Sequence, residues 1–292
     1  MKDFTYLAPT TLKAALGLLS EHRGKVKVLA GGTDLMLQLQ GGMFSPDYVV
    51  DVKNIPELMT LDYGPRFGLT IGAATSLRSV ETSAIVLEKY PHLAASAGEI
   101  GSIQIRNQGS FGGNICTATP SGDGIPSLVS LDATARIASV RGERKVPLTE
   151  FFKGVRKTVL ENDELLIDLH IPPPAAKTSG SYVKLDTRPQ MDLAIVGVAT
   201  TVTVSADGKT IQKASICLGA VATTPIRIPE AEEILAGKPV TDDLLARAGA
   251  AAARAARPIS DVRASAEYRR EQCDLMTQRA LRTAIERARA AA

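Results

Sequence analysis

Cysteine, histidine and aromatic residues are scarce in this 292-residue sequence, which has no tryptophan and only 4% aromatic residues. The three cysteines lie far apart without a Cys-x-x-Cys pair, and the three histidines are equally scattered. Neither a disulfide framework nor a zinc or iron–sulfur site is therefore predicted in this chain. This cysteine usage favours a reducing, cytoplasmic setting. The residues concerned are Cys116, Cys217, Cys273, His22, His92 and His170.

Long apolar runs and a concentrated charge of one sign are also missing. No stretch approaches the ~18–20 apolar residues needed to span a bilayer, and the N-terminus MKDFTYLAPTT lacks the apolar segment of a signal peptide. The net charge of +3 comes from 34 basic and 31 acidic residues that are mixed along the chain, so nucleic-acid binding is not predicted. The length and the 45% apolar content indicate a globular protein that is long enough for two domains.

Glycine, by contrast, is concentrated in the stretch GSIQIRNQGSFGGNICTATPSGD, residues 101–123. At this density of glycine we expect neither a good helix nor a good strand, but an exposed backbone. Two explanations remain open. The main chain either makes tight turns for its own sake, or it lies against a ligand whose bulk leaves no room for a Cβ atom.

A second glycine pair follows a strand-like run near the N-terminus, in VKVLAGGTDLML at residues 26–37. The pattern predicts a strand that ends at Gly31 and Gly32 and a helix that begins at Thr33 or Asp34. Backbone N–H groups at the start of a helix have no partner within it, so they suit an anion. Two such loops can hold one diphosphate.

Periodicity, capping residues and turn signals predict an alternation of elements up to the prolines at 172–174, then strands followed by helices, an α+β arrangement. In the long final helix, Cys273, Met276, Ala280 and Ala284 fall on one face, where we expect core packing. The predicted helices span 11–19, 33–40, 75–80, 91–100, 125–131, 229–235 and 241–256, with the last from 265. The predicted strands span 26–30, 48–52, 69–73, 134–140, 165–171, 182–185, 193–204 and 211–218.

Five segments resemble the FAD-binding subunits of the molybdenum hydroxylases, a family that acts on xanthine, carbon monoxide, nicotinate or 4-hydroxybenzoyl-CoA. These are AGGTDLM, TIGAATSLRSVE and IRNQGSFGGNI with the PSGD and LVSLDA that follow it, together with YVKL…DLAIVGVA and DVRASAEYR. The resemblance covers nearly the whole chain. It implies an α+β protein with a two-subdomain FAD-binding fold of the vanillyl-alcohol oxidase type, in residues 1–57 and 58–174. A linker at 175–180 and a smaller α+β C-terminal domain at 181–292 would follow.

In that family both glycine loops clamp the FAD diphosphate with backbone amides, so the resemblance implies cofactor contacts here. Asp123 matches a family acid that binds ribityl or ribose hydroxyls, and a carboxylate suits this role because it accepts from two hydroxyls. Lys184 and Arg188 align with a segment near the isoalloxazine ring, or else are solvated charges at a strand end. The loop residues implied are Ala30, Gly31, Gly32, Thr33, Asp34, Leu35, Ser110, Phe111, Gly112, Gly113 and Asn114.

Two of these loop residues leave an alternative open. Asp34 beside a diphosphate looks repulsive, yet early in a helix it would favour the N-terminal dipole by ~0.3–1 kcal/mol if its side chain points away. Phe111 either stacks on a flavin or adenine ring or packs in the core, and we favour the core.

The resemblance further implies an electron-transfer subunit without catalytic residues of its own. FAD would take electrons from a small [2Fe-2S] subunit and pass them to NAD+ or another acceptor, while the substrate is oxidised in a large molybdopterin subunit. The expected assembly is a dimer of heterotrimers. The alternative is a stand-alone FAD-dependent reductase or oxidase on the same fold, such as the cell-wall enolpyruvyl reductase, which needs a proton donor over the flavin.

Overall fold

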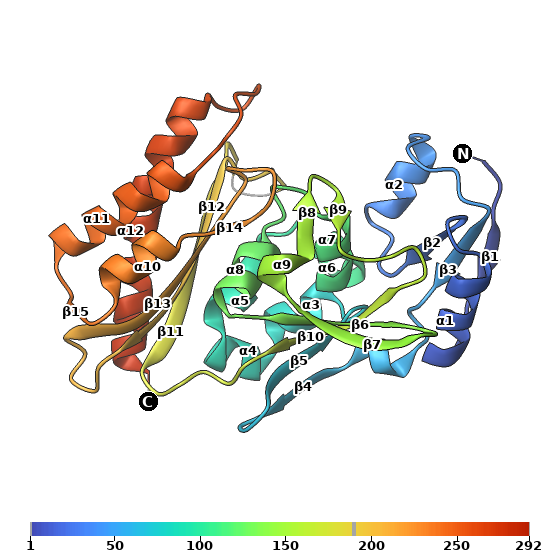
Figure 1. Cartoon of the computed structure of the whole chain (residues 1–292), viewed down its shortest axis with the longest axis horizontal. Helices are drawn as coiled ribbons and strands as arrows, with labels where there is room; N and C mark the ends of the chain where they lie inside the picture. The colour runs from blue at the N-terminus through green and yellow to red at the C-terminus, as the bar shows by residue number, and fades with distance from the viewer. Residues whose placement is uncertain (1, 189–190, 292) are drawn as a thin grey trace.

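The computed structural model describes residues 2–188 and 191–291, and its first unit is a small parallel sheet with the strand order β1-β3-β2 (Figure 1). The helix that joins the first two strands begins as predicted, because the Thr11 hydroxyl caps it by accepting from the Ala14 N–H. The strand β1 was not predicted. The elements are β1 (Thr5–Leu7), α1 (Leu12–Glu21), β2 (Val26–Leu29), α2 (Leu35–Gln40) and β3 (Tyr48–Asp51).

The second unit is an antiparallel five-stranded sheet with the order β4-β5-β10-β6-β7. Its central strand β10 carries fully buried Ile167, Leu169 and Ile171, so it forms the middle of the core. The elements are η1 (Pro56–Met59), β4 (Leu61–Gly64), β5 (Gly68–Gly72), α3 (Leu77–Thr82), α4 (Ala84–Lys89), α5 (Pro91–Gly98), α6 (Ile103–Gln108), α7 (Phe111–Thr117), α8 (Gly124–Ser130), β6 (Thr134–Ser139), β7 (Gly142–Pro147), α9 (Leu148–Phe151), β8 (Phe152–Gly154), β9 (Lys157–Thr158) and β10 (Leu165–Ile171).

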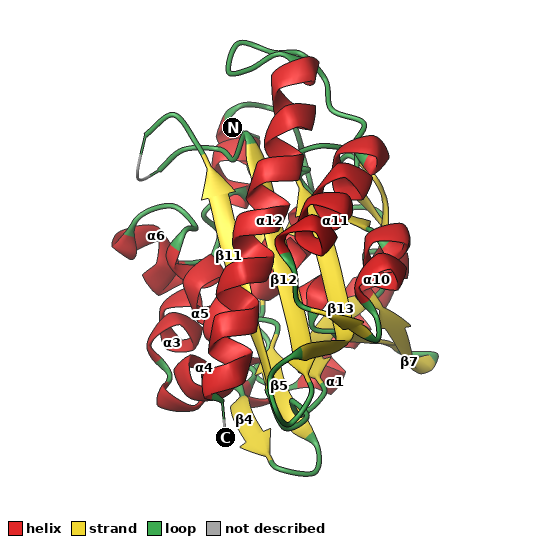
Figure 2. Ribbon diagram, turned by 90° about the vertical axis from the view of Figure 1, so that its left-hand side faces the viewer, coloured by secondary structure: helices red, strands yellow, loops and turns green. Residues whose placement is uncertain are grey.

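The third unit is a sheet with the order β11-β12-β13-β14, to which β15 is added at β13. Its helices lie together on one face (Figure 2), and Cys273, Met276, Ala280 and Ala284 of the last helix are buried there, as predicted. The elements are β11 (Thr178–Leu185), β12 (Val196–Val204), β13 (Thr210–Gly219), β14 (Ile226–Arg227), α10 (Pro229–Leu235), β15 (Lys238–Pro239), α11 (Asp242–Ala255) and α12 (Ala266–Ala290).

The opposite face of the third sheet packs directly on α5 and α8 of the second unit. Glycine makes this close approach possible. A Cβ atom on Gly180 would overlap the His92 ring and lie 2.6 Å from the Thr200 carbonyl oxygen, and one on Gly219 would lie 2.7 Å from Cγ of Pro126. Because no side chain fits at these points, the backbone of the third sheet lies directly against the side chains of His92 in α5 and Pro126 in α8.

The α+β class is confirmed, but the glycine-rich stretch 101–123 differs from the expectation of an irregular backbone. It contains α6 and α7, which begin where Ser102 and Ser110 accept hydrogen bonds from the N–H groups of Ile105 and Gly113. In α7, which contains Gly112 and Gly113, the Ser110 cap offsets the low helix propensity of glycine, whereas α6 contains no glycine. The strand β11 begins at Thr178, within the segment expected to be a linker.

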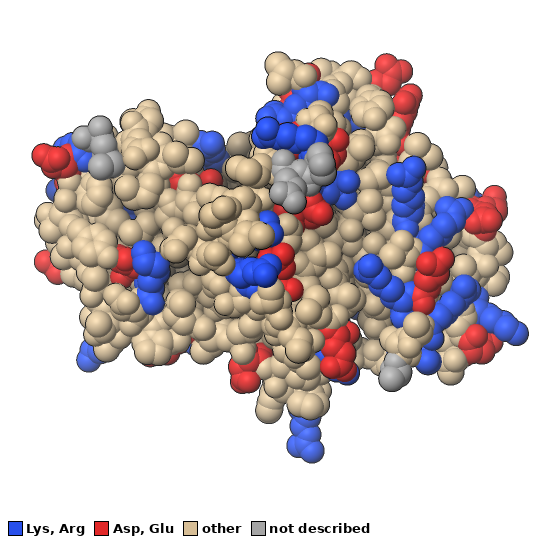
Figure 3. All heavy atoms as spheres, turned by 180° about the vertical axis from the view of Figure 1, so that it is seen from behind, with Lys and Arg blue, Asp and Glu red and all other residues tan. Residues whose placement is uncertain are grey.

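Charge and hydropathy of the described residues agree with the composition. On the face in Figure 3, basic side chains lie among acidic ones and form no continuous basic surface. Within residues 2–188 and 191–291, no helix is long and apolar enough to cross a membrane. The same residues contain no group of three or more His, Cys, Asp and Glu that could hold a metal ion.

Candidate functional site

The two glycine loops of the sequence lie against each other in the structure. The first, residues 30–34, follows β2, and the second, residues 109–113, comprises the connection from α6 and the first residues of α7. A Cβ atom on Gly31 would overlap the carbonyl oxygen of Gln108 and lie 2.7 Å from Cα of Gly109. Gly31 is thus required because one backbone packs on the other. The tight-turn explanation and the ligand explanation are therefore compatible, since this packing itself assembles a shared surface.

A third segment, residues 73–77 after β5, is hydrogen-bonded to the second loop and packs against it. The N–H of Leu77 donates to the Gly109 carbonyl over 2.8 Å, within an isolated bridge between Ser76 and Ser110. A Cβ atom on Gly112 would lie 2.7 Å from Cα of Ala73. The missing side chain at Gly112 therefore serves contact with the protein itself, and not with a ligand.

Gly113 and Gly32 are different. A Cβ atom on Gly113 would meet only the Ser110 hydroxyl, at 3.4 Å, so this position borders open space. Gly32 has φ of +73°, a left-handed conformation that a side chain would strain. An added methyl group at Gly113 would therefore point into open space, unlike one at Gly31 or Gly112.

The first loop offers a row of free donors. Within the described ranges of the chain, the backbone N–H groups of residues 30–34 bind no protein acceptor, and Asp34 gives α2 no side-chain cap. The Asp34 side chain is exposed, and Leu35 is the first residue of the helix. Successive unpaired N–H groups in a turn form a concavity that suits an anion with several oxygens.

Asn114, in the first turns of α7, has a buried amide oxygen without a hydrogen-bond partner among the described residues. It lies beside Gly122, where a Cβ atom would be 3.3 Å from this oxygen. An unsatisfied buried acceptor costs about 1–3 kcal/mol, so the site fits a ligand that brings a hydroxyl or amine donor. FAD has both the diphosphate that the N–H groups suit and such hydroxyls.

The Phe111 side chain does not take part in this surface. It is fully buried, and a Cβ atom on Gly124 would lie 2.7 Å from its Cδ1. This agrees with the core packing that we favoured for Phe111.

Asp123 lies at the start of α8, and its two carboxylate oxygens are held from the C-terminal sheet. One oxygen accepts from the Tyr182 hydroxyl over 2.8 Å and the other from Nζ of Lys184 over 3.1 Å. Burial raises the pKa of the Asp123 carboxyl to about 6, although Lys184 and Tyr182 act in the opposite direction. Both β11 residues therefore favour a charged Asp123 in a site that disfavours charge.

Lys184 is not the solvated charge that was one alternative, because its side chain is only 4% exposed. Its Nζ also donates to the carbonyl of Asp192, over 2.9 Å, and to that of Glu99, over 3.4 Å. Arg188 is exposed and donates to the Met191 carbonyl. Lys184 thus joins three chain segments, while Arg188 stays within its own loop.

Sequence reasoning missed Tyr182 as a site residue. Its signal was the strand period of two, which places residues 182 and 184 on the same face of β11. Their common partner Asp123 lies about sixty residues away in sequence, so no local pattern could reveal it.

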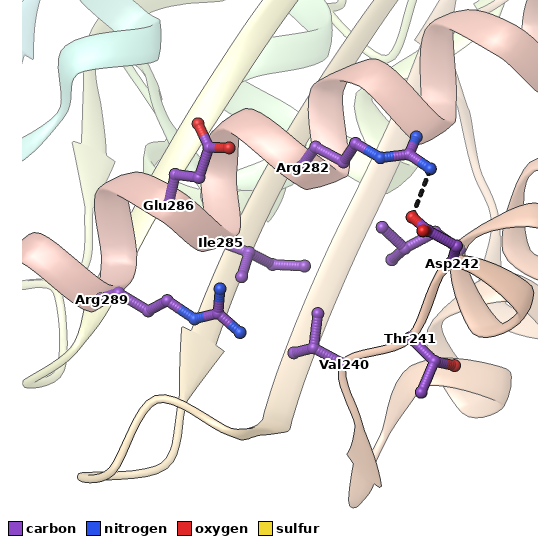
Figure 4. A pocket seen from close by; sticks show the side chains of 8 residues that line it. Val240, Thr241, Asp242, Arg282, Ile285, Glu286 and Arg289 are labelled. Atoms are coloured by element: carbon purple, nitrogen blue, oxygen red, sulfur yellow. Dashed lines mark hydrogen bonds and ion pairs between the residues drawn. The ribbon is translucent and has the colours of Figure 1, made fainter.

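A pocket of ≈ 350 Å³ lies elsewhere, where α11 begins beside the last turns of α12 (Figure 4). Arg282 and Asp242 form an ion pair of 2.6 Å at its edge, in which Asp242 is 87% exposed. An exposed pair of this kind contributes little to stability. The pocket contains none of the loop residues, so we do not assign it to their site.

The chain matches two family models and several known proteins. Residues 2–174 match the FAD binding domain in molybdopterin dehydrogenase, and residues 181–284 match the CO dehydrogenase flavoprotein C-terminal domain. The chain is 35% identical over 245 residues to the nicotinate dehydrogenase FAD-subunit of Eubacterium barkeri, with 82% of each chain covered. It is 32% identical to the xanthine dehydrogenase FAD-binding subunit of Escherichia coli O157:H7, over 98% of this chain and 97% of that one.

A solved structure agrees with these matches. Carbon monoxide dehydrogenase from Hydrogenophaga pseudoflava, in a form that lacks the Mo-pyranopterin moiety, superimposes with a TM-score of 0.93 at 32% identity. The alignment covers 97% of this chain and 98% of that chain.

Proposed function

The chain belongs to the family of FAD-binding subunits of molybdopterin dehydrogenases, and from this we propose that it is the electron-transferring FAD subunit of a three-component hydroxylase. Its partners in this proposal are a small [2Fe-2S] subunit and a large molybdopterin subunit, arranged as a dimer of heterotrimers in the cytoplasm. The organic substrate would be oxidised in the large subunit, so this chain needs no catalytic acid or base.

The observation that carries the proposal is the contact between the two glycine loops. It brings the loop with the free N–H groups of residues 30–34 against Gln108 and Gly109, which directly precede the Ser110 cap of α7. We assign the FAD diphosphate to this surface. Asn114 would satisfy its buried amide oxygen on a ribityl hydroxyl, and Asp123 would accept from a second hydroxyl.

The residues around this site bind, orient and shield, while the redox chemistry belongs to the cofactor. When bound, FAD supplies a two-electron store that can be filled one electron at a time and emptied to NAD+ or another acceptor. The chain fixes the loops by backbone packing at Gly31 and Gly112 and fixes Asp123 from β11. A pre-formed site of this kind reduces the ordering cost of binding.

The test is purification of the tagged chain from its native host, followed by native mass spectrometry and a visible spectrum. We expect one FAD per chain, together with an iron–sulfur chain and a molybdenum chain in equal amounts. FMN instead of FAD would contradict the diphosphate assignment, because FMN has a single phosphate. A lone flavoprotein that reduces an organic substrate by itself would refute the subunit assignment and favour the stand-alone enzyme.

A further inference from the structure

Two side chains of the C-terminal unit reach across the contact with the second unit, from the same face of β11. The side chains of Tyr182 and Lys184 both donate to Asp123, the residue that precedes α8 of the second unit. The Tyr182 phenol has room because Gly197 lies beside it on β12, where a Cβ atom would be 3.0 Å from the hydroxyl oxygen. The sheet is therefore shaped to present this hydroxyl to Asp123.

The Asp123 carboxylate keeps free acceptor capacity in this arrangement. An ionised carboxylate accepts about four hydrogen bonds, and the two protein donors from β11 use one position on each oxygen. Because each oxygen is held by one donor, the plane of the carboxylate is fixed, and so are the directions in which it can accept further hydrogen bonds. An Asp123 without these donors would be free to rotate or to become protonated.

We propose that Tyr182 is a positioning residue for the cofactor, which together with Lys184 holds the Asp123 carboxylate in the orientation that retains FAD. The C-terminal unit is then a structural part of the FAD site, although the second unit supplies the carboxylate. This inference rests on the proposed function, because it assumes that FAD hydroxyls are bound by Asp123.

Because of the charges around Asp123, the effect of Tyr182 on FAD binding should depend on pH. Lys184 favours the carboxylate, Glu99 disfavours it, and Asp186 lies 3.9 Å from the Lys184 ammonium group. The pKa of about 6 means that the carboxyl gains a proton as the pH falls through this value. Loss of the Tyr182 hydroxyl removes a donor to the charged form, so the carboxyl would become protonated at a higher pH.

The experiment compares Tyr182→Phe with wild type in the assembled complex, by measuring the rate of FAD release from its fluorescence across about pH 5–8, on either side of the raised pKa of about 6 of Asp123 and above the ordinary range of such a carboxyl. We expect release to be about ten-fold faster, and the pH at which release accelerates to move upward. The matched control is Tyr90→Phe, which removes a buried hydroxyl bonded to the Pro172 carbonyl at 2.9 Å. This control should lower the melting temperature and leave FAD release unchanged.

A second comparison keeps the test decisive if Tyr182→Phe affects folding. In an Asp123→Asn background, Tyr182→Phe should add no further change in FAD release, because its effect passes through the carboxylate. Lys184→Arg should retain FAD better than Lys184→Met, since Arg keeps the charge. Equal effects of Tyr182→Phe in both backgrounds, or release at the wild-type rate at every pH, would overturn the positioning role. Absence of FAD from the wild-type complex would instead refute the proposed function.

Discussion

Replacement of Gly113 by alanine separates the two explanations for the glycine loops. The added methyl group meets only the Ser110 hydroxyl, at 3.4 Å, so the protein accommodates it without a shift. Gly113 lies in the first turn of α7, where alanine is the better helix former, with the gain of about 0.5–1 kcal/mol in a helix interior as the upper bound. The apoprotein should therefore be as stable as wild type or slightly more stable.

The cofactor should respond in the opposite direction. If the diphosphate lies against Gly113, the methyl group occupies space that the ligand needs. A misfit of one methyl group in a packed contact costs about 1–3 kcal/mol, which is roughly a 5- to 150-fold rise in Kd. Fluorescence titration of the apoprotein with FAD and urea unfolding of the same samples measure the two effects.

Two glycine variants serve as controls for Gly113→Ala. Gly17→Ala in α1 adds a methyl group with nothing within 4 Å, so it should raise stability without a change in FAD affinity. Gly112→Ala should instead destabilise the apoprotein, because its methyl group lies 2.7 Å from Cα of Ala73. If Gly113→Ala binds FAD as tightly as Gly17→Ala does, the diphosphate does not lie at this loop and our assignment is wrong.

Two further variants test the supports of the site. Gly180→Ala places a methyl group over the His92 ring and 2.6 Å from the Thr200 carbonyl oxygen. We expect a loss of stability of about 1–3 kcal/mol in thermal melting. An unchanged melting temperature would show that the packing around Gly180 adjusts at no cost. Ser110→Ala removes the cap that accepts from the Gly113 N–H over 3.0 Å. It should cost about 1 kcal/mol in urea unfolding, and a variant as stable as wild type would mean that this cap is dispensable.

Local features were predictable from the sequence because their causes lie within a few residues. The helices predicted at 241–256 and from 265 begin where Thr241 and Ser265 cap them. The glycine pairs were found for the same reason. The density of glycine can be read from a short segment of sequence. The family resemblance can be recognised in the same way, because short motifs carry it.

Only the tertiary structure decided what each glycine contacts. Gly31 meets the backbone at Gln108, and Gly112 meets Ala73, which are partners that no local pattern identifies. The same holds for Lys184, which resembles a surface charge in the sequence and is buried, with its Nζ bonded to Asp123 and to the carbonyls of Glu99 and Asp192. The helix α7 forms despite Gly112 and Gly113 because the Ser110 cap and the close packing of Gly112 on Ala73 outweigh intrinsic propensity. Composition and spacing thus determine which segments can form a site, whereas contacts between distant residues determine which atoms face it.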